Sequence, residues 1–270
     1  MKPDISEFSY GFAVTSEAVT MMGSSISAAP QFPTQYVEGR AGGGYDVKIT
    51  GGTAIFLQFK LSHFMSRSNC KEHLRMGGPY YRWHLHARTL SYQHDLLLSL
   101  ESKGNLVAYT APMFHRSAEL NHHYLNDQIL DNSAAFRPSQ IKPLPDDENH
   151  YVVFNRTGPA YRCSEDPVEV EFDTLNSFLR GLAAKPVQED LESEGGIRLG
   201  EDIIDSMKVA RSQRGKGFQA LGKEIDTDEI IHVIRTRPTL ATLSLISRTV
   251  LDAELLVLNP QWHKVPKRRS

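Results

Sequence analysis

The chain has little cysteine and no long hydrophobic run. Its two cysteines, Cys70 and Cys163, are too few for a disulfide framework and too isolated for a zinc cluster, which favours a reducing compartment. No run approaches the roughly 20 apolar residues of a membrane span. Acids among the first ten residues leave no apolar core for a signal peptide. We therefore expect a cytoplasmic protein with no membrane partner.

The chain also lacks a strong net charge, an internal repeat and a low-complexity tract. The formal net charge of -2 excludes a global positive field that would draw the molecule onto nucleic acid, so any site for a polyanion has to be local. With 270 residues, of which 40% are hydrophobic, the chain can build one sizeable core, alone or with a smaller appendage.

Two neighbouring segments carry the polar residues of greatest interest. Residues 45–50 and 53–61 each predict a strand, and the two glycines between them predict a hairpin. The second segment begins with an apolar run, as in a central strand covered on both faces, and continues as Gln58-Phe59-Lys60. Asp46 lies on the first segment, after a triple glycine. Antiparallel pairing would bring Asp46 close to Lys60.

The alternation of side chains along a strand places Gln58 and Lys60 on one face. An ammonium group that points into apolar packing without a partner is costly. We therefore expect this face to open onto a cleft that holds an acid or an anion, with Asp46 as the nearest partner. A simple ion pair between Asp46 and Lys60 is the alternative.

A helix is predicted from Glu7 to about Met22, with Ser6 as its N-cap. At 100° per residue its apolar stripe would contain Phe8, Phe12, Thr15, Val19 and Met22. Glu7 projects beside the small residues that flank the stripe, and it is the preferred helix acid for a site. Glu17 is predicted to point to solvent. Glu38, in a short strand or loop, is a third candidate.

The order of elements predicts an α/β fold with mixed layers over about residues 4–155. A half-buried strand is predicted at 80–86, a helix at 89–101, an apolar strand at 105–111, a helix at 117–130 and a last strand at 150–154. The pattern then becomes mostly helical, at about 172–184, 200–210, 228–236 and 239–258. A glycine-rich basic segment at 212–222 predicts a mobile loop.

This arrangement resembles the PD-(D/E)xK nuclease superfamily, and most of all its Mrr-type restriction endonuclease branch. Gly43-Gly44-Tyr45-Asp46 and Gln58-Phe59-Lys60 carry the resemblance, which covers about residues 5–112. It implies a restriction-endonuclease-like mixed sheet core flanked by helices at 1–160. Residues 165–270 would form a mostly helical accessory region for assembly, regulation or partner binding.

The resemblance also implies a chemistry. Asp46, the carbonyl of Gln58 and Glu7 would hold Mg²⁺ or Mn²⁺, and Lys60 would act on the attacking water or the transition state. The substrate would be nucleic acid, with DNA favoured over RNA. A role as an antiviral defence effector, controlled by an activating protein partner, is a further implication. Self-association through the C-terminal helices is also expected.

Other polar features have plainer interpretations. Gln93, on an apolar helical stripe, either reaches the site or is an ordinary buried amide. His84 and His86 share a strand face but lack a third ligand at fixed spacing, which favours an exposed face over a metal site. A non-catalytic interaction protein with a degenerate nuclease fold is the alternative for the whole chain.

Overall fold

The computed structural model describes most of the first two thirds of the chain and shorter parts of the rest. The described residues are 1–22, 53–87, 93–163, 166–183, 194–212, 219–220, 223–224, 232–233, 235–236, 242–243, 246 and 254–258. Asp46, Glu38 and the predicted strand at 45–50 lie outside them. The predicted helices at 228–236 and 239–258 also lie largely outside them.

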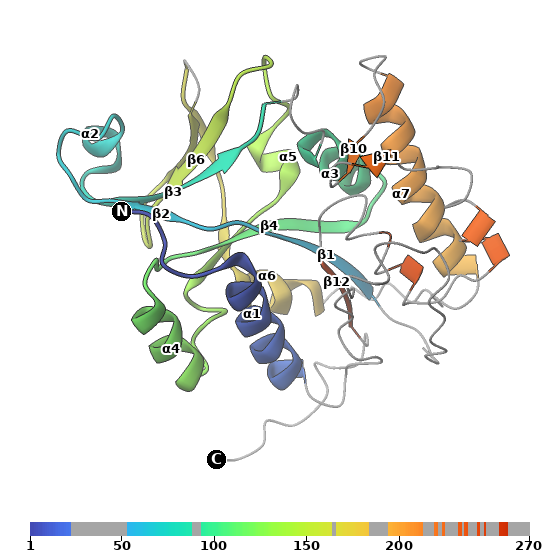
Figure 1. The fold of residues 1–270 in the computed structure, drawn as a ribbon, viewed down its shortest axis with the longest axis horizontal. Helices are drawn as coiled ribbons and strands as arrows, with labels where there is room; N and C mark the ends of the chain where they lie inside the picture. The colour runs from blue at the N-terminus through green and yellow to red at the C-terminus, as the bar shows by residue number, and fades with distance from the viewer. Residues whose placement is uncertain are drawn as a thin grey trace. The chain divides into compact units, whose positions relative to one another are not determined.

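The protein is an α/β protein with two five-stranded sheets flanked by helices (Figure 1). The described helices are α1 (Glu7–Met22), α2 (His73–Met76), α3 (Gln93–Ser102), α4 (Ser117–Leu125), α5 (Pro138–Ile141), α6 (Leu175–Ala183) and α7 (Glu194–Ser212). No helix among these residues is apolar over enough length to cross a membrane.

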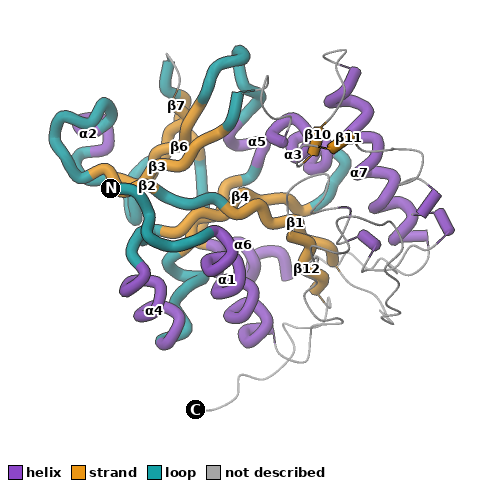
Figure 2. The backbone as a smooth tube through the Cα atoms, viewed as in Figure 1, coloured by secondary structure: helices purple, strands orange, loops and turns teal. Residues whose placement is uncertain are grey.

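The first sheet has the strand order β12-β1-β4-β5-β9, and the second has the order β2-β3-β6-β7-β8. The strands are β1 (Thr53–Phe59), β2 (His63–Met65), β3 (Tyr80–Leu85), β4 (Leu106–Pro112), β5 (Ser133–Phe136), β6 (His150–Phe154), β7 (Ala160–Cys163), β8 (Val168–Val170), β9 (Asp173–Thr174) and β12 (Glu254–Leu258). A small hairpin pairs β10 (Gln219–Ala220) with β11 (Lys223–Glu224). Every pair in the second sheet is antiparallel, and Figure 2 shows β3, β6 and β7 side by side.

The chain divides into two compact units that alternate along the sequence. The first unit consists of Met1–Met21, Gln58–His94 and Ala108–Leu182, and the second of Met22–Leu57, Asp95–Val107 and Ala183–Ser270.

Aromatic side chains fill the core of the first unit between its strands. Trp83 of β3 is fully buried, and its ring centroid lies 5.1 Å from that of Tyr109 on β4 and 5.7 Å from that of Phe136 on β5. Phe154 of β6 meets Phe136 edge to face at 5.2 Å. Edge and tilted contacts of this kind add to the stabilisation from burial alone. The inner face of the second sheet therefore packs on β4 and β5.

Helix α1 begins as the sequence predicts, because the Ser6 hydroxyl accepts a hydrogen bond from the Ser9 amide at 3.0 Å. The predicted apolar stripe is wrong at Phe8 and Phe12, whereas Thr15 is buried as predicted. Phe8 and Phe12 are 67% and 50% exposed, whereas the buried face of α1 contains Tyr10, Gly11, Ala13, Val14, Thr15 and Ala18. Phe12 instead meets Tyr124 of α4, and Figure 1 shows the two helices next to each other.

Two predicted boundaries in the C-terminal half are also wrong. The strand at 150–154 is not the last, because β7, β8 and β9 follow it. Residues 254–258, predicted to end a long helix, form β12 and pair antiparallel with β1. A short apolar run such as Glu254–Leu258 has no periodicity that separates a buried strand from a helix. Residues 219–220 are part of a hairpin in the segment predicted to be a mobile loop.

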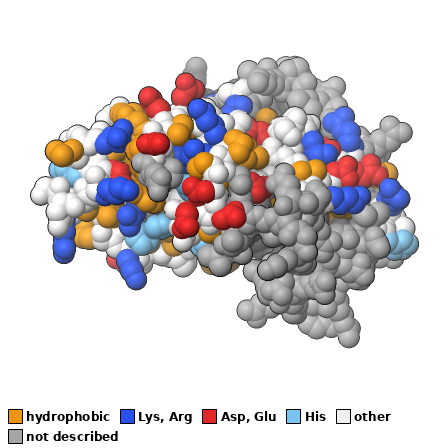
Figure 3. Space-filling view, turned by 90° about the horizontal axis from the view of Figure 1, so that it is seen from above, with side chains coloured by type: hydrophobic (Ala, Val, Ile, Leu, Met, Phe, Trp, Pro, Cys, Tyr) orange, Lys and Arg blue, Asp and Glu red, His pale blue; other side chains and the backbone are white. Residues whose placement is uncertain are grey.

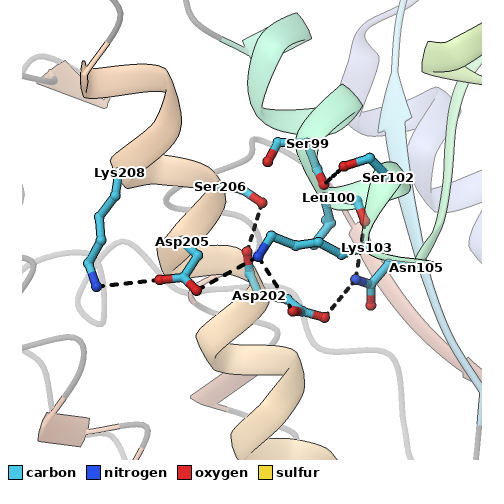
Figure 4. Close-up of polar contacts among 9 residues, drawn as sticks. All are labelled: Ser99, Leu100, Ser102, Lys103, Asn105, Asp202, Asp205, Ser206 and Lys208. Carbon is cyan, nitrogen blue, oxygen red and sulfur yellow. Dashed lines mark hydrogen bonds and ion pairs between the residues drawn. The ribbon is translucent and has the colours of Figure 1, made fainter.

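In the second unit, polar contacts connect α7 to the residues that follow α3 (Figure 4). Asn105 donates to the carbonyl of Leu100 at 3.2 Å and to the carboxylate of Asp202 at 3.0 Å. The Lys103 ammonium lies 3.8 Å from Asp202 and 3.7 Å from Asp205. These contacts hold α7 against the C-terminal end of α3.

Candidate functional site

Gln93, at the start of α3, brings Gln58 and Lys60 together on one face of β1. Its side-chain Nε2 donates to Oε1 of Gln58 at 2.7 Å, and its Oε1 accepts from Nζ of Lys60 at 2.8 Å. Gln58 is almost fully buried and Lys60 is partly exposed. The prediction that Gln58 and Lys60 share a face is confirmed. Gln93 contacts both side chains, so of the two roles that the sequence allowed it, the structure supports the one in which it reaches the site.

Tyr109 and His94 lie next to this cluster and contact each other. The Lys60 ammonium lies 5.9 Å from the centre of the Tyr109 ring, within range of a cation–π attraction. The Tyr109 hydroxyl lies 3.0 Å from Nδ1 of His94, and Nε2 of His94 lies 2.9 Å from the carbonyl of Lys142. A carbonyl only accepts, so Nε2 carries the proton, and in the neutral ring Nδ1 accepts from Tyr109. Hydrogen bonds thus fix the positions of the Tyr109 and His94 side chains.

Helix α1 packs on the other face of β1. Phe59, between Gln58 and Lys60, meets Tyr10 edge to face at 5.8 Å. A Cβ atom at Gly11 would lie 3.0 Å from the Phe59 ring, so glycine allows this close approach. Glu7 is exposed on α1. Its role as a metal ligand stays a prediction, because the contacts of Gln58 and Lys60 described above come from α3 and β4.

The other two candidate acids have separate outcomes. Glu17 does not point to solvent, because its carboxylate accepts hydrogen bonds from the amides of Ile129 and Leu130. Burial is the main cause of its raised pKa. Glu17 therefore anchors the segment after α4. Glu38, like Asp46, lies outside the described residues.

The described part of the chain holds no group of three or more His, Cys, Asp or Glu side chains placed to bind a metal ion. His84 on β3 and His86 just after it belong to no such group, and both are exposed. The oxygen donor that the structure places in the candidate site is the side chain of Gln58. Its Oε1 accepts a hydrogen bond from Nε2 of Gln93.

Two members of the site were not predicted from the sequence. Tyr109 sits in a predicted apolar strand, and His94 follows Gln93 on a predicted apolar helix. The signal that could have found them is the polar pair Gln93-His94 at the start of that helix, because adjacent buried polar groups need partners.

Replacing Gln93 by leucine is expected to lower the free energy of unfolding by about 2 kcal/mol, because the buried Gln58 and the partly buried Lys60 each lose a hydrogen bond. Gln93→Glu keeps an acceptor for Lys60 and loses the donor to Gln58, so we expect about half that loss. Urea denaturation of both variants measures the effect. A leucine variant as stable as the wild type would contradict this interpretation of the cluster.

Comparison of the chain with models of known protein families, with curated proteins and with solved structures finds no match.

Proposed function

We propose that this protein is a metal-dependent nuclease that hydrolyses phosphodiester bonds of nucleic acid, with DNA favoured over RNA. The observation that supports it best is the cluster of Gln58, Lys60 and Gln93, in which Gln93 links a partly exposed ammonium group to a buried amide oxygen. Asp46 is the proposed carboxylate partner, from the strand predicted to precede β1.

Mg²⁺ and Mn²⁺ prefer oxygen ligands, and Asp46 and Gln58 would supply two of them, with Glu7 as the third candidate. When bound, such an ion makes water a stronger nucleophile and neutralises charge on phosphoryl oxygens. Lys60 would stabilise the same developing charge from a fixed position. Gln93 and Tyr109 would keep the Lys60 ammonium in that position.

The test is incubation of the purified protein with plasmid DNA and with a single-stranded oligonucleotide, in Mg²⁺ or Mn²⁺ and in EDTA. We expect cleavage that needs the metal and that falls to background in Asp46→Asn. Mn²⁺ binding by calorimetry is expected to weaken in the same variant, a readout independent of turnover. Equal cleavage by the wild type and Asp46→Asn would refute the proposal.

A non-catalytic interaction protein is the second candidate, because the hydrogen bonds of Gln93 also fit a purely structural polar cluster. This candidate predicts no Mn²⁺ binding at millimolar concentration and no cleavage by any variant. An activating protein partner and self-association through the C-terminal region belong to the nuclease proposal as further expectations.

A further inference from the structure

The second sheet has one face away from the core of the first unit, and we call it the outer face. Directly opposed residues of an antiparallel pair share a face. His63 pairs with Arg82, Arg82 with Val153, and Val153 with Tyr161, so these four form one row across the sheet. His84 and Tyr151 form the next row. Tyr81 and Trp83, which alternate with Arg82, point to the core.

The segment that contains α2 covers part of this face, and its one acidic residue, Glu72, is buried. Met76 packs with Tyr80, Val153 and Cys163 in a small hydrophobic cluster. Glu72 is 4% exposed, and its carboxylate accepts hydrogen bonds from the hydroxyls of Tyr80 and Tyr151. Burial, followed by these contacts with Glu72, raises the pKa of both tyrosines. The carboxylate is therefore committed to the interior.

The cations of the same region remain at the surface. Residues 63–87 contain four basic side chains, Arg67, Lys71, Arg75 and Arg82, and only Glu72 as an acid. The first three are exposed and Arg82 is partly exposed. None of the four forms an ion pair with an acidic side chain among the described residues. Figure 3 shows Lys, Arg and His side chains at the left of the view, with hydrophobic ones and some acidic ones near them.

Aromatic rings lie beside two of these charges. The guanidinium carbon of Arg82 is 5.2 Å from the ring centre of Tyr151, and that of Arg75 is 5.4 Å from the ring centre of Tyr161. The His84 ring contacts both Tyr151 and His63. A guanidinium over a tyrosine ring can still donate its N–H groups to a phosphate.

The charge around the two histidines has one sign. Burial lowers the pKa of His63, and so do the neighbouring cations Arg82, the amino terminus and Lys2. Burial also lowers the pKa of His84, together with Arg82, His63 and His86. No carboxylate of the described residues is among the groups that shift the pKa of either ring. Glu169, opposite Tyr161, and the acids at 146–148 before β6 lie at the borders of the face.

We propose that the outer face of the second sheet binds single-stranded nucleic acid, with phosphates on Arg67, Lys71, Arg75 and Arg82 and bases stacked against Tyr151, Tyr161 and His84. Cations alone would suit any polyanion. The aromatic rings beside Arg75 and Arg82 favour a strand with accessible bases, because base stacking on aromatic side chains is the common mode of single-strand binding. Delivery of that strand to Lys60 for cleavage rests on the proposed nuclease function, whereas the binding does not.

Fluorescence anisotropy with a labelled 20-nucleotide oligo(dT) in EDTA tests the binding without cleavage. Arg67→Gln/Lys71→Gln/Arg75→Gln is expected to weaken the affinity about tenfold or more at 100 mM salt. It should also reduce the slope of log K against log salt by about 2, because each phosphate contact on a single strand contributes about 0.7. Tyr161→Leu is expected to weaken binding about fivefold through lost stacking.

The matched control is Arg180→Gln/Lys208→Gln/Arg235→Gln, which removes the same charges from exposed positions elsewhere. We expect its affinity to stay within twofold of the wild type. Equal losses in the two triple variants would overturn the proposal. Competition by a DNA duplex or by polyglutamate as effective as competition by oligo(dT) would also overturn it, because the face would then recognise charge alone.

The outcomes separate this inference from the nuclease proposal. If oligo(dT) binding depends on the outer face but no metal supports cleavage, the binding surface stands and the nuclease proposal fails. If metal-dependent cleavage is found and the triple variant of the outer face binds oligo(dT) like the wild type, this inference fails alone.

Discussion

In the proposed nuclease, cleavage of nucleic acid is expected to fall by about 100- to 1,000-fold when Lys60 is replaced by methionine, because the variant would lack a fixed positive charge beside the reacting phosphate. The Lys60 ammonium is held by Gln93 at 2.8 Å and lies over the Tyr109 ring, so its position is set before substrate binds. A group that acts mainly in the transition state lowers kcat when it is removed and leaves KM nearly unchanged. Steady-state cleavage of a labelled oligonucleotide in Mg²⁺ measures both constants.

Two comparisons make this result specific. Lys103→Met removes a lysine of the second unit that contacts Asp202 and Asp205, and we expect its kcat to stay within twofold of the wild type. Lys60→Arg keeps the charge but has a wider, planar head group, so we expect partial activity. Cleavage by Lys60→Met at the wild-type rate would remove Lys60 from the mechanism.

The parts of the fold that the sequence predicts well have strong local signals. Ser6 caps α1 by a contact only three residues long, and the alternation from Tyr80 to Leu85 marks β3 because one of its faces is buried. Gln58 and Lys60 share a face because side chains alternate along a strand. Each of these patterns depends on neighbours in the chain, so it survives whatever the tertiary structure is.

The features that the sequence misses depend on distant contacts. The packing of Tyr10 and Gly11 against Phe59 determines which face of α1 is buried, and Phe12 contacts Tyr124 instead. The contacts of Gln93 with Gln58 and Lys60 span 35 and 33 residues. Strand β12 owes its conformation to pairing with β1, nearly 200 residues earlier. Local propensity does not determine such choices.

Arg162→Met is expected to lower the free energy of unfolding by about 3 kcal/mol. Arg162 lies on the inner face of β7, is 5% exposed, and donates from Nη1 to the carbonyls of Ile141, Lys142 and Pro143 at 3.0, 3.3 and 2.7 Å. Hydrogen bonds from a charged donor contribute about 1.5–3 kcal/mol each. Nη1 carries two hydrogens, so two of the three carbonyls share one of them, and together these bonds outweigh the cost of burying the guanidinium, although that burial lowers its pKa.

The effect of Arg162 should also reach the candidate site, because the carbonyl of Lys142 that it binds also contacts His94 below Lys60. Urea denaturation with an unchanged m-value measures the stability loss. Arg180→Met, at an exposed position on α6, is the control and should change stability by less than about 0.5 kcal/mol. An Arg162→Met variant as stable as the wild type would mean that desolvation of the guanidinium cancels its three hydrogen bonds. The segment before β6 would then be held in place by its apolar contacts, through Ile141 and Leu144, which are both buried.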